Sequence, residues 1–230
     1  MSDRNRPPAG IRTIGELDPQ ATRLVLVRHG ESVANAEGLV GGQLGCRGLT
    51  ALGKAQVSAL ASRWQRTDEA ADVVGLVSST LLRARQTADL LEVALPAARR
   101  LADRRDLSEL EVGEADGLSW VEFEQRFGRP DWDRDPGQPI APGGESWQGF
   151  VVRVEAALQA LVEAQQGQRV VVCCHAGVIE ASLIAHLYDA PPSTRLQLRS
   201  DHAGVTEWAI DSRGWRLLSY NSTTPLALVR

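Results

Sequence analysis

Two of the four histidines in this chain stand at the ends of short apolar runs. His29 comes shortly after an apolar run at 24–27, and His175 comes directly after a second run at 170–174. Runs of this length and composition predict buried parallel strands, whose carboxyl ends form the edge where open α/β sheets bind ligands. We therefore expect both imidazoles at one ligand-binding edge, although the first run alone could equally end in a surface turn.

The neighbours of these two histidines suit a turn that holds an anion. Gly30 and Gly177 allow the chain to turn sharply at the strand ends. Arg28 offers a planar guanidinium with several donors, which matches an anionic group such as phosphate. The other histidines, His186 and His202, lie in no such pattern. The grouping predicts a histidine side chain held beside a bound anion.

A third strand end carries another arginine. Residues 72–77 are predicted to form a parallel strand, and Thr80 is expected to cap a helix that runs to about Val93. Arg83 then falls in the first turn of that helix, where unpaired backbone amides and the helix dipole favour an anion. A solvated surface arginine is the alternative interpretation.

The rest of the chain alternates predicted strands with predicted helices. Further helices are expected from Thr50 to about Arg66, from Ser119, from Ser146 to about Gln165, and after His175 to about Tyr188. A β-hairpin is expected near the end of the chain, with strands over 204–210 and 215–220. This alternation predicts an α/β fold with a layered, mostly parallel sheet. Residues 1–20 are expected to be a polar extension, followed by a single domain over 21–230.

Composition narrows the class of protein. A 230-residue chain with 43% hydrophobic residues can bury a sizeable core, and a net charge of −4 argues against nucleic-acid binding through a broad basic face. Neither a transmembrane stretch nor a signal core is evident, so we expect a cytoplasmic protein without membrane contact. The three cysteines do not suggest disulfides; adjacent Cys173 and Cys174 are expected to be buried on opposite faces of a strand.

Taken in order, the motifs resemble the histidine phosphatase (phosphoglycerate mutase-like) superfamily. The matches lie between about 22 and 185 and comprise Arg28 to Ser32 with Asn35, Gly48 to Thr50 with Gly53 and Gln56, the stretch 78–88, Glu109 with Gly113 and Gly117, the stretch 142–146, and the stretch 175–179. The resemblance implies a three-layer α/β/α fold with a mostly parallel central sheet. It also implies hydrolysis of a small phosphorylated metabolite, with no cofactor and no metal.

The resemblance further implies roles for single residues. His29 is expected to attack phosphorus through Nε2 and form a phosphohistidine, while a backbone carbonyl at the turn holds its Nδ1 proton. His175 is expected to stabilise charge as an imidazolium. Glu109 is the expected proton donor and acceptor, although composition alone does not separate it from Glu111 or Glu114.

A second set of residues is expected to bind the phosphate itself. The expected ligands of the phosphate oxygens are Arg28, Arg83, Asn35, His175 and the backbone amide of Ala176. The family usually has glycine where Ala176 stands, but a backbone contact tolerates alanine. The glycine-rich stretch 38–48 lacks the hydroxyl that the family's mutases carry there, so its backbone amides are expected to contact phosphate.

The phosphatase branch is favoured over the mutases. The interval from Glu109 to His175 is shorter and richer in proline and glycine than the insert with which the mutases exclude water. A metal-independent, histidine acid phosphatase-type phosphomonoesterase is therefore expected, with a small-molecule phosphomonoester as its partner. Mutase-type phosphoryl transfer and a catalytically silent phosphate-binding module are the alternatives; a metal hydrolase lacks a ligand cluster in the sequence.

Residues 110–147 are expected to cover the pocket. Aromatic residues are frequent within 118–147, where they could set substrate specificity or form a small satellite core. The sequence is also compatible with a homodimer.

Overall fold

A six-stranded sheet forms the centre of the computed structural model, which describes residues 17–187 and 198–224. The strands lie in the order β3-β2-β4-β1-β5-β6. The first four of these strands are parallel, and β5 and β6 form an antiparallel hairpin on one edge. Their bounds are β1 (Thr22–Arg28), β2 (Val73–Ser78), β3 (Arg99–Arg100), β4 (Arg169–Cys174), β5 (Val205–Asp211) and β6 (Gly214–Ser222). The predicted mostly parallel α/β sheet is confirmed.

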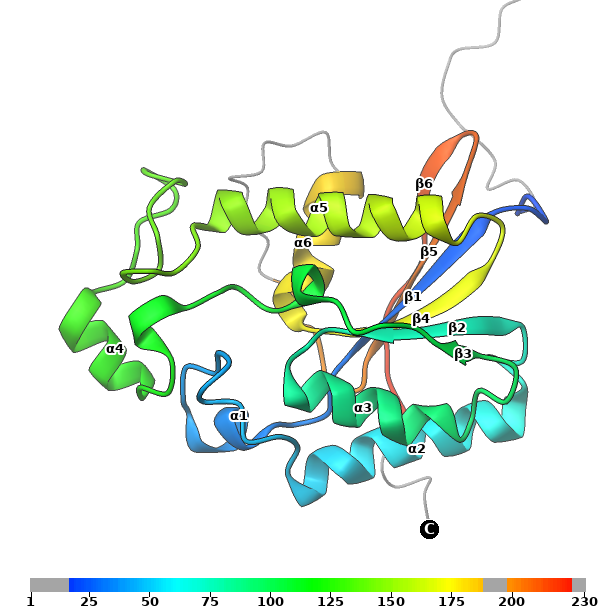
Figure 1. Cartoon of the computed structure of the whole chain (residues 1–230), viewed down its shortest axis with the longest axis horizontal. Coiled ribbons are helices and arrows are strands. Elements are labelled where there is room, and N and C mark those ends of the chain that lie inside the picture. The colour runs from blue at the N-terminus through cyan, green and yellow to red at the C-terminus, as the bar shows by residue number, and fades with distance from the viewer. Residues whose placement is uncertain (1–16, 188–197, 225–230) are drawn as a thin grey trace, which may run out of the picture.

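Helices cover both faces of the sheet (Figure 1). α5 and α6 pack on one face, and α2 and α3 pack on the other. The helices are α1 (Val33–Glu37), α2 (Ala51–Thr67), α3 (Leu82–Glu92), α4 (Trp120–Phe127), α5 (Trp147–Ala164) and α6 (Ala176–Leu187). Because side chains alternate along a strand, Cys173 joins the α2/α3 core and Cys174 joins the α5/α6 core, as predicted.

Most helix starts follow the expected capping residues. The Thr50 hydroxyl accepts a hydrogen bond from the Gly53 amide, and Ser119 forms a capping box. The predicted Thr80 cap is wrong, because α3 starts one residue later, after Leu81. The Thr80 hydroxyl instead lies 3.3 Å from the Ser108 hydroxyl.

Two predictions fall on residues outside the described part of the chain. These are the helix end near Tyr188 and most of the polar extension at 1–20, which therefore stay predictions. Within 17–187 and 198–224, no helix has the length and apolar character needed to cross a membrane.

The register of the parallel strands brings three strand ends to one level. Arg28 of β1 pairs with Cys174 of β4, and the amide of His29 donates to the Cys174 carbonyl at 3.0 Å. On the other side of β4, the amide of Ser79 donates to the Cys173 carbonyl at 3.0 Å. The residues that follow β1, β2 and β4 therefore emerge together at the carboxyl edge of the sheet.

The turn after β1 packs closely against the start of α2. A Cβ atom on Gly53 would lie 2.0 Å from the Glu31 carbonyl oxygen, and one on Gly30 would lie 2.4 Å from the Gly53 carbonyl oxygen. Both close contacts are with backbone atoms, which cannot rotate away as a side chain can. Two glycines thus allow the turn that carries His29 to lie directly on α2.

Gly53→Ala should destabilise the protein by roughly 1–3 kcal/mol, although alanine favours a helix, because overpacking against backbone outweighs helix propensity. The matched control is Gly149→Ala. Gly149 is also the third residue of its helix, α5. A Cβ atom there would meet only the hydroxyl of Ser146, the N-cap residue of α5, at 3.2 Å. Urea unfolding of both variants checks this; equal stability of the two would contradict it.

Candidate active site

His29 is buried and held in one orientation. Its Nδ1 atom lies 2.7 Å from the Gly30 carbonyl oxygen, so Nδ1 carries the proton and donates it, as predicted from the turn. Its Nε2 atom accepts a hydrogen bond from Arg83 Nε at 3.1 Å. Burial, followed by the nearby charges of Arg83 and Arg28, lowers the pKa of His29 well below its ordinary value. The ring is therefore a neutral base whose lone pair faces the site.

His175 lies beside His29, as the strand register requires. The two ring centroids are 5.1 Å apart, and His175 Nε2 lies 2.6 Å from the Ser79 hydroxyl. Burial is the main cause that lowers the pKa of His175 well below its ordinary value, and the nearby Arg83 charge lowers it further. The imidazolium expected at His175 is therefore not favoured in this structure. A phosphate dianion beside the ring would act in the opposite direction, because an opposite charge favours the protonated form.

Two arginines surround the imidazoles with positive charge. Arg83 is only 4% exposed and Arg28 donates to the Ser200 carbonyl oxygen. Among the described residues, Arg83 Nη1 and Arg28 Nε are buried without a hydrogen-bond partner. A buried, unpaired cationic donor is costly, so an anion that accepts from both groups would be stabilised here.

Asn35 and Ala176 are the two further residues expected to bind phosphate. Asn35 lines the same cavity as His29, and its Oδ1 accepts from the Ser32 amide and hydroxyl at 3.2 and 2.7 Å. These bonds direct the side-chain NH₂ group of Asn35 away from Ser32. Ala176 is the first residue of α6. Its backbone amide is therefore one of the donors in the first helical turn that have no acceptor within the helix.

The glycine-rich loop does not present its amides as expected. The amides of Gly42, Leu44 and Gly45 donate to the Asp116 carboxylate at 2.9, 2.6 and 2.8 Å. The prediction that backbone amides of 38–48 contact phosphate is therefore wrong for these three groups, because a carboxylate of the same chain already occupies them. Gly41 still lines the cavity beside Arg83.

His202 is a site residue that the sequence analysis missed. Its ring centroid is 5.9 Å from that of His29, and its Nε2 lies 3.3 Å from Asn35 Oδ1. Burial and the Arg28 charge lower its pKa to about 4. His202 precedes the hairpin strand β5, whose first residue Val205 pairs with Val27 near the end of β1, so its position depends on strand pairing and not on a local motif.

Glu109 is the carboxylate that reaches the site. It lines the cavity with His29, whereas Glu111 pairs with Arg105 and Glu114 is exposed. Its two oxygens accept from the amides of Leu110 and Gly177 at 3.2 and 3.1 Å. A Cβ atom on Gly177 would lie 2.2 Å from Glu109 Oε1, so glycine at this position lets the carboxylate approach α6.

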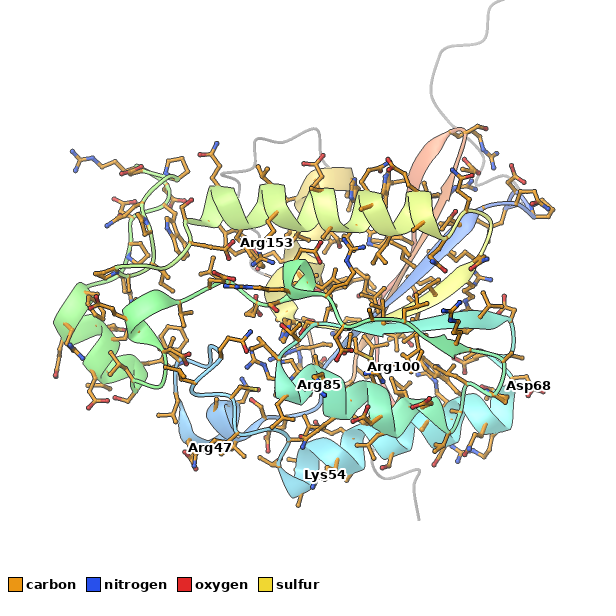
Figure 2. The ribbon with its side chains drawn as sticks, viewed as in Figure 1. Arg47, Lys54, Asp68, Arg85, Arg100 and Arg153 are labelled. Carbon is orange, nitrogen blue, oxygen red and sulfur yellow. The ribbon has the colours of Figure 1, made fainter. Side chains whose placement is uncertain are left out.

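A partly buried ion pair holds the segment that carries Glu109. Arg153 of α5 (Figure 2) forms a bidentate ion pair with Glu145. Its Nε and Nη2 atoms each donate to one carboxylate oxygen at 2.7 Å. The same guanidinium donates to the carbonyl oxygens of Asp106 and Ser108 at 2.8 and 3.1 Å, and to that of Glu109 at 3.4 Å. Glu145 in turn accepts from the Glu111 amide at 2.9 Å. Both sides of Glu109 are therefore tied to α5.

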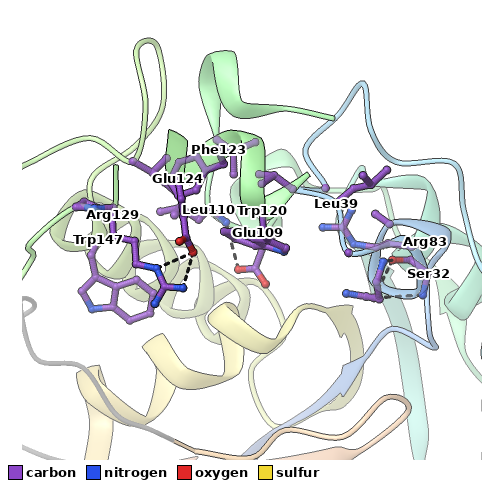
Figure 3. A pocket seen from close by; sticks show the side chains of 18 of the residues that line it. Ser32, Leu39, Arg83, Glu109, Leu110, Trp120, Phe123, Glu124, Arg129 and Trp147 are labelled. Atoms are coloured by element: carbon purple, nitrogen blue, oxygen red, sulfur yellow. Dashed lines mark hydrogen bonds and ion pairs between the residues drawn. The ribbon is translucent and has the colours of Figure 1, made fainter. Parts of the chain in front are cut away.

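The site opens into a cavity of about 590 Å³ (Figure 3). The segment predicted to cover the pocket lines it through aromatic residues that include Trp120, Phe123, Trp132 and Trp147. Phe123, Trp132 and Trp147 also belong to the buried core beneath α5 and α6. The aromatic residues thus contribute to the main core rather than to a separate satellite core. Within the described residues, no group of three or more histidine, cysteine or acidic side chains is placed to hold a metal ion.

Arg83→Gln should weaken the binding of inorganic phosphate about 10- to 100-fold, because a charge-assisted hydrogen bond contributes about 1.5–3 kcal/mol. Arg85→Gln is the matched control: Arg85 lies on the same helix (Figure 2) but pairs with Asp103 and is half exposed. Titration calorimetry with phosphate measures both. Equal loss of affinity in the two variants would show that Arg83 is not a specific phosphate ligand.

Comparison with known proteins identifies the family of this chain. The chain matches the family model of the histidine phosphatase superfamily (branch 1) over residues 24–223. It is 30% identical over 215 residues to a metal-independent phosphoserine phosphatase from Arabidopsis thaliana, covering 90% of this chain and 87% of that protein. It is 33% identical over 186 residues to phosphoglycerate mutase-like protein 4 from the same plant, covering 77% and 75%.

A solved structure extends the agreement to the fold. A mycobacterial glucosyl-3-phosphoglycerate phosphatase aligns with a TM-score of 0.70 and 27% identity, covering 88% of this chain and 100% of that one. The resemblance proposed from the motifs is confirmed by the family match and by this structural likeness. The chain belongs to the histidine phosphatase superfamily, branch 1.

Proposed function

We propose that this protein is a metal-independent phosphomonoesterase that hydrolyses a small phosphorylated metabolite through a phosphohistidine at His29. The observation that carries the proposal is the neutral His29 ring, whose Nε2 lone pair faces Arg83 beside two unpaired guanidinium donors. Membership of the histidine phosphatase superfamily and the phosphatases among its relatives support phosphomonoester hydrolysis.

The first step transfers the phosphoryl group to the protein. Arg28 and Arg83 hold phosphate oxygens while the His29 Nε2 lone pair forms a bond to phosphorus. The bond from phosphorus to the ester oxygen breaks, and Glu109 in its acid form gives that oxygen a proton. His175 lies next to the transferring group, where its ring can gain a proton from solvent as the dianion is bound.

The second step returns the protein to its starting state. Glu109, now a carboxylate, takes a proton from water as the water oxygen bonds to phosphorus. The bond from phosphorus to His29 Nε2 breaks, and the ring regains its lone pair. Inorganic phosphate leaves, and Glu109 keeps the proton for the next cycle.

The positive charge of the side chains supports a reaction without a metal ion. Arg28 and Arg83 meet the phosphate charge directly, as the unpaired donors of their guanidinium groups indicate. The relative from Arabidopsis thaliana carries metal independence in its name. Mutase-type transfer is the alternative function, and the short interval rich in proline and glycine between Glu109 and His175 favours attack by water instead.

A time course with excess chelator tests hydrolysis against transfer. We expect phosphate release from phosphomonoesters to persist in the presence of chelator. We also expect little isomerisation of 3-phosphoglycerate. Rapid isomerisation with negligible phosphate release would establish mutase-type transfer instead. Loss of phosphate release on chelation, restored by a divalent cation, would refute metal independence.

His29→Ala should abolish labelling of the protein by a phosphorylated substrate, because it removes the nucleophile. The label on the unmodified protein should be acid-labile and base-stable. His186→Gln is the control and should still be labelled. His186 lies in the last turn of α6, at the opposite end of the helix from His175, and its ring stacks on Trp215. Full activity of His29→Ala would exclude the covalent mechanism.

Arg153→Lys should lower kcat on alkyl phosphates about 10- to 100-fold, because it loosens the segment that carries Glu109. The fall in kcat on p-nitrophenyl phosphate should be much smaller, because its leaving group, p-nitrophenolate, needs little protonation. Arg105→Lys is the control, because Arg105 pairs with Glu111 at the exposed side of the same segment. A loss of the same size on both kinds of substrate would show a merely structural role for Arg153.

A further inference from the structure

Building on the phosphatase function proposed above, we propose that the natural substrate is the phosphate ester of a bulky, uncharged alcohol with a flat apolar ring. The cavity beside the phosphate site takes this leaving group in preference to a small carboxylate-bearing one, such as that of phosphoserine or 3-phosphoglycerate. The leaving group would lie in the part of the cavity beyond the residues assigned to the chemistry.

The wall of the cavity is apolar beyond the phosphate site. Its side chains there include Leu110, Trp120, Phe123, Trp132, Ile140 and Trp147. The volume of about 590 Å³ falls within the range of about 300–1,000 Å³ that small-molecule pockets occupy. The space is therefore large for a three-carbon leaving group, which would leave much of it unfilled.

The charges in the cavity do not provide for a substrate carboxylate. Among the described residues that line it, the cations are Arg28 and Arg83 at the phosphate site and Arg129. Arg129 lies on the far side of the cavity from Arg83 and is paired with Glu124, whose carboxylate accepts from Arg129 Nε at 2.7 Å (Figure 3). A carboxylate entering that end would meet Glu124 as well as Arg129, so the pair offers it little net attraction.

The aromatic wall is formed before any ligand binds. Phe123, Trp132 and Trp147 are each less than 8% exposed, and the Trp132 indole donates to the Gln138 carbonyl oxygen at 2.7 Å. Trp132 and Trp147 lie 5.9 Å apart, centroid to centroid. Because these rings are already fixed by core packing, a flat ligand binds to them without the cost of ordering side chains.

Trp120 completes the wall from the solvent side. Its ring packs edge-on against Phe123 at a centroid distance of 5.6 Å, and the residue remains 48% exposed. An exposed tryptophan beside a cavity has apolar area that a ligand ring can cover. Since it contributes little to the core, Trp120 is the residue whose removal tests the wall without disturbing the fold.

The substrate test compares kcat/KM on four alkyl phosphates: 2-phenylethyl phosphate, ethyl phosphate, phosphoserine and 3-phosphoglycerate. All four have alkoxide leaving groups, so differences report binding of the leaving group rather than its chemistry. The expected result is that 2-phenylethyl phosphate exceeds each of the others by tenfold or more. Equal or higher values for phosphoserine or 3-phosphoglycerate would overturn the substrate class while leaving the phosphatase function intact. Absence of phosphate release from all four would overturn both.

Two variants locate the effect in the wall. Trp120→Ala should lower the ratio of kcat/KM on 2-phenylethyl phosphate to that on ethyl phosphate by roughly tenfold. Val121→Ala is its control, because Val121 is the next residue of α4, is 65% exposed and does not line the cavity. Glu124→Gln should raise kcat/KM on 3-phosphoglycerate severalfold, because it leaves Arg129 without its counter-charge. An unchanged ratio in Trp120→Ala, or an unchanged value in Glu124→Gln, would contradict the proposal.

Discussion

The hydrogen bond from Arg83 to His29 is the contact on which the site depends. A guanidinium donates to Nε2 at 3.1 Å in a buried position, which is compatible only with a neutral ring. The same burial that removes the proton from His29 leaves the Arg83 charge without a counter-ion among the described residues. The neutral imidazole and the unpaired guanidinium therefore have one physical origin, since both follow from placing a cation and an imidazole together away from water.

The scaffold achieves this placement through backbone contacts at glycines. Gly30 and Gly53 let the His29 turn lie directly on α2, and Gly177 lets the Glu109 carboxylate reach the start of α6. In each case a Cβ atom would lie within 2.4 Å of an oxygen atom. His29, Arg83 and His175 follow three strand ends, so the parallel register sets their spacing, while the glycines determine how closely the loops and helices approach them.

The sequence predicted the features that follow from local pattern, and it failed where distant segments meet. Apolar runs and strand ends were enough to place His29, His175 and Arg83 at one edge, because parallel strands share that edge. His202 was missed because its proximity to His29 comes from antiparallel pairing of β5 with β1, which no local motif signals. For His175, burial is the main cause that lowers the pKa and favours the neutral ring when no phosphate is bound, and burial is a property of the packed protein that local sequence does not show.

The glycine-rich loop shows how a distant carboxylate can redirect a local signal. Backbone amides in such a loop are suited to bind an anion, and they do bind one, but it is Asp116 of the same chain. These amides are therefore already occupied, while Gly41 of the same loop lines the cavity beside Arg83. The unpaired guanidinium donors of Arg28 and Arg83 lie at one end of the cavity, while the opposite wall is apolar apart from one ion pair. Charge is therefore concentrated at one end of the cavity, and the aromatic wall is separate from the cluster of His29, His175 and Arg83.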